Sequence, residues 1–108
     1  MIKAISFVTR KPGVSRGEFI RHYEEAHAPL AQRHFPFKRY VRNYVMEGQA
    51  GELGFDCVTE VWFETMEDCA AAAAFSASEG YGVIREDEER FMDRERIVAF
   101  LVEERESA

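Results

Sequence analysis

The pattern of hydrophobic and polar residues predicts four β-strands, because short stretches rich in β-branched and aromatic side chains recur between turn signals. The predicted strands span residues 2–9, 38–46, 57–63 and 95–103. The first and the last have apolar side chains at both parities, which is typical of strands covered on both faces. Three glycines between the two middle strands predict a flexible acidic loop, so these strands form a hairpin.

The longest stretch with a period of 3.6 residues predicts a helix from Ser15 to about Arg33. Ser15 and Glu18 have the spacing of a capping box, in which each side chain satisfies a free amide of the first turn. We expect a kink or fraying near Pro29, since its ring removes an amide donor. The apolar stripe of this helix consists of Phe19, Tyr23, Ala26, His27 and Leu30.

Two further helices are predicted after the third strand. Thr65 caps an alanine-rich helix through about Ala77, where alanine favours the helix and permits close approach to a sheet. A shorter helix covers residues 81 to about 90 and carries the acidic run Glu86-Asp87-Glu88-Glu89. We expect this run to form a solvated face, with a binding feature as the alternative.

The order β-α-β-β-α-β predicts a ferredoxin-like α+β fold, in which the helices cover one face of a four-stranded antiparallel sheet. The 108 residues suit a single domain. The other face of the sheet is too apolar to stand in water. We therefore expect two copies to pack open face to open face as a homodimer, a dimeric α+β barrel with a cavity in each half.

The charge balance argues against two classes of partner. Fourteen basic and twenty acidic residues give a net charge of -6, which opposes binding to nucleic acid and to anionic membrane surfaces. No apolar run approaches the roughly 20 residues of a membrane span, and the N-terminus lacks a signal-peptide pattern, so we expect a cytoplasmic protein. Cys57 and Cys69 show no disulfide framework, and we expect them to pack as small apolar residues.

His27 is the first candidate for a catalytic residue, because it lies on the apolar stripe of the first helix two residues before Pro29. An imidazole is the side chain best able to take and return a proton near neutral pH. The alternative is a core histidine that is hydrogen-bonded to a carbonyl freed by Pro29. We expect His22 and His34 to lie on the surface.

Glu60 is the second candidate, since a carboxylate between Val58 and Trp62 on one face of a strand is costly unless it is paired or lines a cavity. In the catalytic interpretation Glu60 orients His27 or binds the substrate. In the alternative, Glu60 forms an ion pair with Arg42 of the neighbouring strand.

Three aromatic residues, Tyr40, Tyr44 and Trp62, are expected to line the same side of the sheet. Their flat rings and polar tips would suit a small planar organic substrate. Packing at the dimer interface explains them equally well. Tyr23 and Arg42 complete the predicted set of substrate-binding residues.

No metal site is expected, because no histidine pair or histidine and cysteine cluster has the spacing of a ligand set. No glycine-rich phosphate loop is present for a nucleotide either. We expect no cofactor, although a single histidine would suffice to bind haem.

Four segments resemble the EthD family of dimeric α+β barrel proteins: RKPGVSRGEFIRHYEEAHAPL at 10–30, RYVRNY at 39–44, TEVWF at 59–63 and EERFMD at 88–93. The resemblance covers nearly the whole chain and agrees with the predicted topology. The wider superfamily includes muconolactone isomerases, polyketide cyclases, dehydratases, decarboxylases, cofactor-free monooxygenases and haem-degrading enzymes, so the fold by itself does not name the reaction.

The family motif aromatic-x-x-x-His-x-Pro-Leu falls on Tyr23, His27, Pro29 and Leu30. The family often has tryptophan in place of Tyr23 and histidine in place of Tyr44. The tyrosine at position 44 therefore argues against a mechanism that needs two imidazoles.

These observations leave three hypotheses for the function. The first is a cofactor-independent small-molecule enzyme that shuttles protons in isomerisation, cyclisation, dehydration or decarboxylation, within aromatic, polyketide-type or ether catabolism. The second is a ligand-binding or accessory dimer with the same pocket and no chemistry. The third is an oxidative enzyme, either cofactor-free or dependent on haem.

Overall fold

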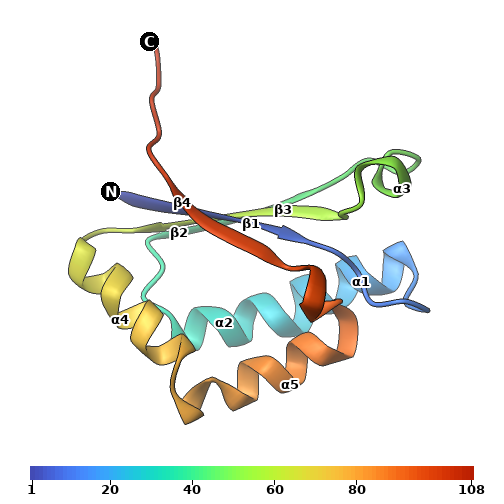
Figure 1. Ribbon diagram of the computed structural model, residues 1–108, viewed down its shortest axis with the longest axis horizontal. Coiled ribbons are helices and arrows are strands. Elements are labelled where there is room, and N and C mark those ends of the chain that lie inside the picture. The colour runs from blue at the N-terminus through green and yellow to red at the C-terminus, as the bar shows by residue number, and fades with distance from the viewer.

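The computed structural model describes residues 1–108 and shows one sheet with most of its helices gathered on one face (Figure 1). The strands are β1 (Ile2–Val8), β2 (Arg39–Tyr44), β3 (Cys57–Phe63) and β4 (Val98–Val102). The α-helices are α1 (Arg16–His22), α2 (Ala28–His34), α3 (Ala50–Leu53), α4 (Met66–Ser76) and α5 (Gly82–Phe91). A π-helical turn, Tyr23–His27, joins α1 to α2, and 3-10 turns at Glu79–Tyr81 and Arg94–Arg96 precede α5 and β4. The predicted ferredoxin-like α+β fold is confirmed.

The sheet has the order β2-β3-β1-β4, and all of its strand pairs are antiparallel. The predicted hairpin of β2 and β3 is present. Its connection contains the single helical turn α3 rather than only a flexible loop, and Gly54 ends that turn with a φ of 82°, which favours glycine. In the register of the sheet, Thr59 lies opposite Ser6 of β1 and Arg42 of β2, which fixes the side chains that share a face.

The first helix begins as predicted at Ser15, whose side chain accepts a hydrogen bond from the Glu18 amide at 3.1 Å. Its regular period is interrupted by the π turn, where the amide of Ala28 bonds to the carbonyl of Tyr23, five residues earlier. Pro29 has no amide to offer the carbonyl of Glu25, so an ordinary α-helical ladder is already broken here. The predicted kink near Pro29 thus takes the form of a π turn.

The π turn changes which residues face the core. It adds one residue to a turn, so the buried positions after it move forward by one. Ala28 and Ala31 are buried, whereas Ala26 is exposed and Leu30 is only half-buried. The predicted stripe is therefore right for Phe19, Tyr23 and His27 and wrong for Ala26 and Leu30.

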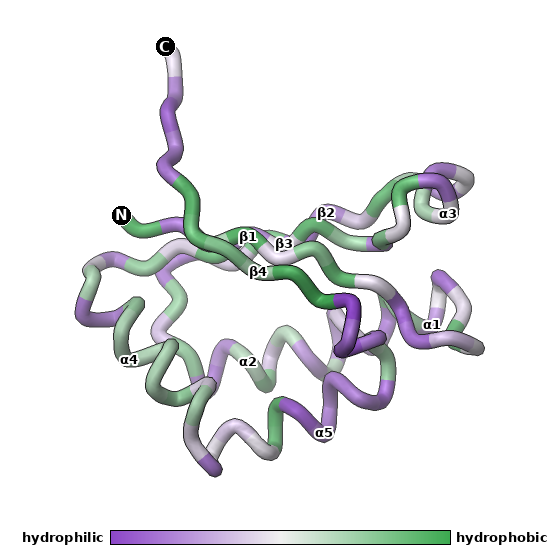
Figure 2. Tube along the Cα trace, viewed as in Figure 1, coloured by the Kyte–Doolittle hydropathy of each residue, from purple (hydrophilic) through white to green (hydrophobic).

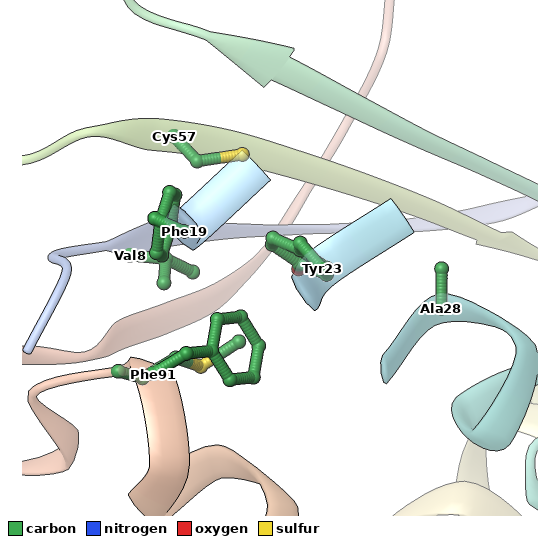
Figure 3. Close-up of a cluster of buried hydrophobic side chains, with 7 residues drawn as sticks. Val8, Phe19, Tyr23, Ala28, Cys57 and Phe91 are labelled. Atoms are coloured by element: carbon green, nitrogen blue, oxygen red, sulfur yellow. The ribbon is translucent and has the colours of Figure 1, made fainter. Parts of the chain in front are cut away.

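The hydrophobic core lies between the sheet and the first and last helices (Figure 3). Phe19 and Tyr23 of the first helix meet Phe91 at the end of α5, with ring centroids 5.6 and 5.3 Å from that of Phe91. Val8 of β1 and Cys57 of β3 close the cluster from the sheet side. Cys57 is fully buried, as expected for a packing cysteine.

The opposite face of the sheet has no helix over it (Figure 1). Phe7 of β1 stacks on Phe55 with ring centroids 4.8 Å apart and meets the edge of Phe100. Val98 and Phe100 of the edge strand β4 are 52% and 39% exposed, and this strand is strongly hydrophobic along its length (Figure 2). Such an apolar face is unusual for a surface in water. None of the helices combines the length and hydropathy that crossing a membrane would require.

Candidate active site

A cavity of about 450 Å³ lies between the helix-covered face of the sheet and the helices, and 19 of its 24 lining residues are hydrophobic. Small side chains leave this space open. Ala4, Ser6 and Ala99 line it from β1 and β4, and Cys69, Ala72, Ala73 and Ser76 line it from α4. The alanine-rich sequence of α4 therefore has a second consequence besides helix propensity, because larger residues on this face would fill the cavity.

His27, the last residue of the π turn, is 4% exposed and lines this cavity. Its Nδ1 lies 2.8 Å from Oδ2 of Asp87 on α5, so Nδ1 carries the hydrogen and donates it to the carboxylate. His27 Nε2 makes no hydrogen bond to another protein group. No fully buried polar side-chain atom lacks a partner, so Nε2 reaches the accessible surface of the cavity. The free nitrogen of the neutral ring is thus an acceptor that is open to the cavity.

Asp87 orients the His27 ring, and the Asp87 side chain is only 7% exposed. Its Oδ1 accepts hydrogen bonds from His22 Nε2 at 3.0 Å and from Arg90 Nη1 at 3.1 Å. Burial alone would raise the pKa of Asp87, but the hydrogen bonds from His27 and His22 outweigh it and lower the pKa. An ionised Asp87 fixes both the tautomer and the direction of the His27 ring.

Burial lowers the pKa of His27 below its ordinary value, against the opposing effects of Asp87 and Glu88. The ring is therefore neutral at pH 7 and able to accept a proton at Nε2. A neutral base inside an apolar cavity is the state that general base catalysis requires.

Glu88, the neighbour of Asp87 on α5, also lines the cavity and is 9% exposed. Its Oε1 accepts hydrogen bonds from the Tyr81 hydroxyl at 2.8 Å and from Arg94 Nε at 3.2 Å. The cavity therefore contains a carboxylate that is paired through one of its two oxygens.

Two of the predicted aromatic residues, Tyr23 and Tyr40, line the cavity. The hydroxyls of Tyr23 and Thr59 are 2.7 Å apart. Burial raises the pKa of Tyr40 to about 12, so its hydroxyl stays protonated and able to donate a hydrogen bond.

Arg42 and Tyr44 share the face of Tyr40 but are engaged elsewhere. Arg42 Nε and Nη2 bond to the Glu24 carboxylate at 2.8 and 2.9 Å, and the Tyr44 hydroxyl donates to the same carboxylate. The predicted ion pair of Arg42 with Glu60 is wrong, because Arg42 lies opposite Thr59 in the sheet and its side chain turns to the other face from Glu60.

Glu60 and Trp62 lie on the uncovered face of the sheet, away from His27. Glu60 Oε2 is 2.6 Å from Lys3 Nζ, and Glu60 Oε1 accepts a hydrogen bond from Asn43 at 2.8 Å. Trp62 lies beneath the cations of Lys3 and Arg39, 4.6 and 4.5 Å from its ring centroid. Contrary to the prediction, Glu60 does not orient His27, and Trp62 lies on the opposite side of the sheet from Tyr40 and Tyr44. A carboxylate on this face is accommodated by Lys3.

Asp87 and Glu88 were not predicted as site residues, because the acidic run that contains them was expected to form a solvated face. Glu86 and Glu89 are exposed, whereas Asp87 and Glu88 are buried. A signal was present, because the buried residues of α5 recur at i, i+3, i+4 and i+7, and two carboxylates occupy the middle positions. These positions are Ile84, Asp87, Glu88 and Phe91.

The other two histidines, His22 and His34, were both expected to lie on the surface, and only His34 does. His22 instead bonds to Asp87, and its ring centroid lies 4.6 Å from that of Phe91. His34 is exposed, as predicted, and stacks on Phe75.

The lowered pKa of His27 predicts a pH dependence of stability. The unfolded chain titrates near the ordinary value of 6.5 and the folded chain below it, so below about pH 6.5 the unfolded state binds more protons. The stabilisation from neutral His27 is therefore present above pH 6.5 and is lost as the pH falls through the folded pKa. When the pH is lowered from 7 to 5, we expect the urea concentration at the midpoint of unfolding to fall less for His27→Gln than for the wild type. An equal difference in both proteins would contradict this.

Comparison with known proteins gives one family match and several structural matches. A family model described as the EthD domain matches residues 11–95. No curated protein matches the sequence at a significant level.

Solved structures share the fold at low identity. A protein from Arabidopsis thaliana superposes with a TM-score of 0.69 at 17% identity, covering 100% of this chain and 99% of its own. An EthD family protein from Bacillus halodurans gives a TM-score of 0.69 at 18% identity, covering 97% of this chain and 100% of its own. A dimeric protein of unknown function with a ferredoxin-like fold, from Bacteroides fragilis, gives 0.63 at 10% identity, covering 94% of each chain.

Proposed function

This chain belongs to the EthD family, and we propose that it is a small-molecule enzyme that transfers protons in the cavity beneath its sheet without a cofactor. The observation that carries the proposal is the state of His27. Its Nδ1 hydrogen is held by Asp87, and its free Nε2 opens on an apolar cavity. This arrangement suits isomerisation, cyclisation, dehydration or decarboxylation, in which one group removes a proton and returns it.

In the proposed mechanism Nε2 of His27 takes a proton from a carbon or oxygen of the substrate. The positive charge that develops on the ring is stabilised by the Asp87 carboxylate at 2.8 Å. This interaction strengthens in a site with few competing waters. The same nitrogen then returns the proton to a second atom of the substrate, which completes the cycle without an external acid.

The remaining cavity groups define what the substrate resembles. A cavity of about 450 Å³ with apolar walls suits a planar organic molecule of two or three rings. The protonated hydroxyl of Tyr40 can donate a hydrogen bond to a carbonyl or enolate oxygen. Tyr23 also lines the cavity, and its ring lies edge-on to that of His27 with centroids 5.5 Å apart.

Proton transfer can be tested without knowing the natural substrate. The probe is 2-tetralone, a planar bicyclic ketone with exchangeable α-hydrogens, incubated with the protein in D₂O and followed by proton NMR. We expect loss of the α-hydrogen signal faster than in buffer of the same pH. Binding of the ketone with exchange no faster than in buffer would instead favour a ligand-binding protein that lacks chemistry.

We further propose that the chain acts as a homodimer through the uncovered face of the sheet. The apolar residues Phe7, Phe55, Val98 and Phe100 on or beside this face support the proposal. So does the described dimeric state of the structural relative from Bacteroides fragilis. Isologous packing would give each copy the cover that its own helices do not provide.

The dimer is tested by placing a charge on that face. Val98→Glu is expected to convert a dimer into a folded monomer in sedimentation velocity, because a buried unpaired carboxylate opposes association. The matched control is Met66→Glu, an exposed residue of α4 in the helical layer, which should leave the dimer intact. A wild-type protein that sediments as a monomer would contradict the proposal directly.

A further inference from the structure

Glu88 is more fully buried than its pairing explains. The residue is 9% exposed, and both of its hydrogen-bond partners, Tyr81 and Arg94, bond to the same oxygen, Oε1. Oε2 makes no hydrogen bond to the protein. Since no fully buried polar side-chain atom is left without a partner, Oε2 must reach accessible surface, and the surface that Glu88 lines is the cavity.

The cavity therefore offers its ligand two unshared acceptors, Glu88 Oε2 and His27 Nε2. They come from neighbouring elements, since Asp87, which holds His27, precedes Glu88 in α5. The two groups also interact electrostatically, because the Glu88 carboxylate favours the protonated form of His27. Every other wall is mainly apolar.

We propose that Glu88 is a substrate-binding residue that selects ring compounds carrying a hydroxyl group. An apolar body fits the walls of the cavity, and the hydroxyl hydrogen is donated to Glu88 Oε2. A ligand with only acceptors would place a lone pair against the carboxylate and leave it unsatisfied in a desolvated site, which costs affinity. The proposal rests on the proposed function, because it assigns the ligand class of the same cavity.

Tyr81 and Arg94 give this carboxylate its direction. Both donate to Oε1, so that oxygen is occupied by protein donors and Oε2 remains free for a ligand in the cavity. The same arrangement predicts what Glu88→Gln would do. The glutamine oxygen would be retained by the two donors, and its NH₂ group would take the place of Oε2. The variant would thus offer a donor where the wild type offers an acceptor.

The experiment compares 2-naphthol with 2-methoxynaphthalene by equilibrium dialysis. The two probes share their ring system, and only the naphthol has an O–H donor. We expect wild-type protein to bind 2-naphthol about tenfold more tightly or better, the effect of one hydrogen bond to a charged group. Glu88→Gln should bring that ratio to about one or reverse it. Glu89→Gln, an exposed neighbour on the same helix, should keep the wild-type ratio.

Each outcome decides the proposal. A wild-type ratio near one overturns it, and so does a Glu88→Gln protein that is folded by circular dichroism and retains the wild-type ratio. If Glu88→Gln does not fold, Glu88→Asp takes its place, because the shorter side chain withdraws the carboxylate from the cavity and should lower the ratio toward one. A clear preference for 2-naphthol in a protein without deuterium exchange would uphold the assignment of Glu88 and reject only the proton-transfer function.

Discussion

Replacing His27 by alanine is expected to reduce deuterium exchange into 2-tetralone by about 100-fold or more, the usual contribution of a positioned acid or base. The loss follows from geometry, because Nε2 is the basic atom held toward the cavity by a second bond at Nδ1. Stability should fall by only about 1 kcal/mol. Asp87 keeps the bonds from His22 and Arg90, so no buried charge is left without a partner.

The two readouts separate a catalytic from a structural histidine. Exchange rates from NMR and urea unfolding curves are measured on the same protein, with His34→Ala as the matched control, because His34 is exposed and lies outside the cavity. The control should behave as the wild type in both. A His27→Ala protein that is several kcal/mol less stable but retains exchange would assign the residue to packing.

Replacing Phe91 by alanine is expected to cost about 3–5 kcal/mol in the free energy of unfolding, the usual range for a fully buried phenylalanine. The side chain is 1% exposed. Its ring lies 5.0 Å from that of His27, 5.3 Å from Tyr23 and 5.6 Å from Phe19. A cavity at this point would loosen the core and the packing behind the His27 ring together.

The second effect of Phe91→Ala distinguishes it from an ordinary core mutation. Under conditions where the variant is still folded, exchange should also fall, since the imidazole would lose the surface that fixes its orientation. Phe91→Leu keeps most of the volume and should cost less than half as much in stability, with most of the exchange retained. A loss below about 1 kcal/mol for Phe91→Ala in urea unfolding would show that the cluster is not the centre of the core.

Local sequence signals were sufficient for the fold and for most of its elements, although α3 and the π turn were not predicted. Ser15 and Thr65 cap helices as predicted, each accepting a hydrogen bond from an amide three residues later. The predicted strand 57–63 matches β3 at both ends. These features depend on short-range chemistry, such as side-chain alternation and capping, which is written in consecutive residues.

The placement of Glu60 and Trp62 depended on information that no single strand contains. Each strand shows which residues share a face, but the pairing of one strand's faces with those of the next depends on register. Tyr40 lies opposite Val61, not opposite Glu60 or Trp62, and this pairing brings Tyr40 to the cavity side. The long β2–β3 connection, with α3 inside it, carries no turn signal that fixes the register.

The carboxylates of α5 were assigned to solvent because charge is usually a reliable indicator of exposure. Their burial is possible only through partners from distant segments. Asp87 is satisfied by two histidines of the first helix, and Glu88 by Tyr81 and Arg94. Such long-range partners do not appear in the local pattern, although the spacing between Ile84 and Phe91 indicated that the two positions face inward.

The π turn before Pro29 has an evolutionary consequence. If one exposed residue such as Ala26 were deleted, the buried residues after it would fall into the spacing of an ordinary amphipathic helix that continues from Phe19 and Tyr23. A single-codon deletion at this point would therefore leave the hydrophobic face of the helix intact. Relatives with a regular helix here should align with a one-residue gap.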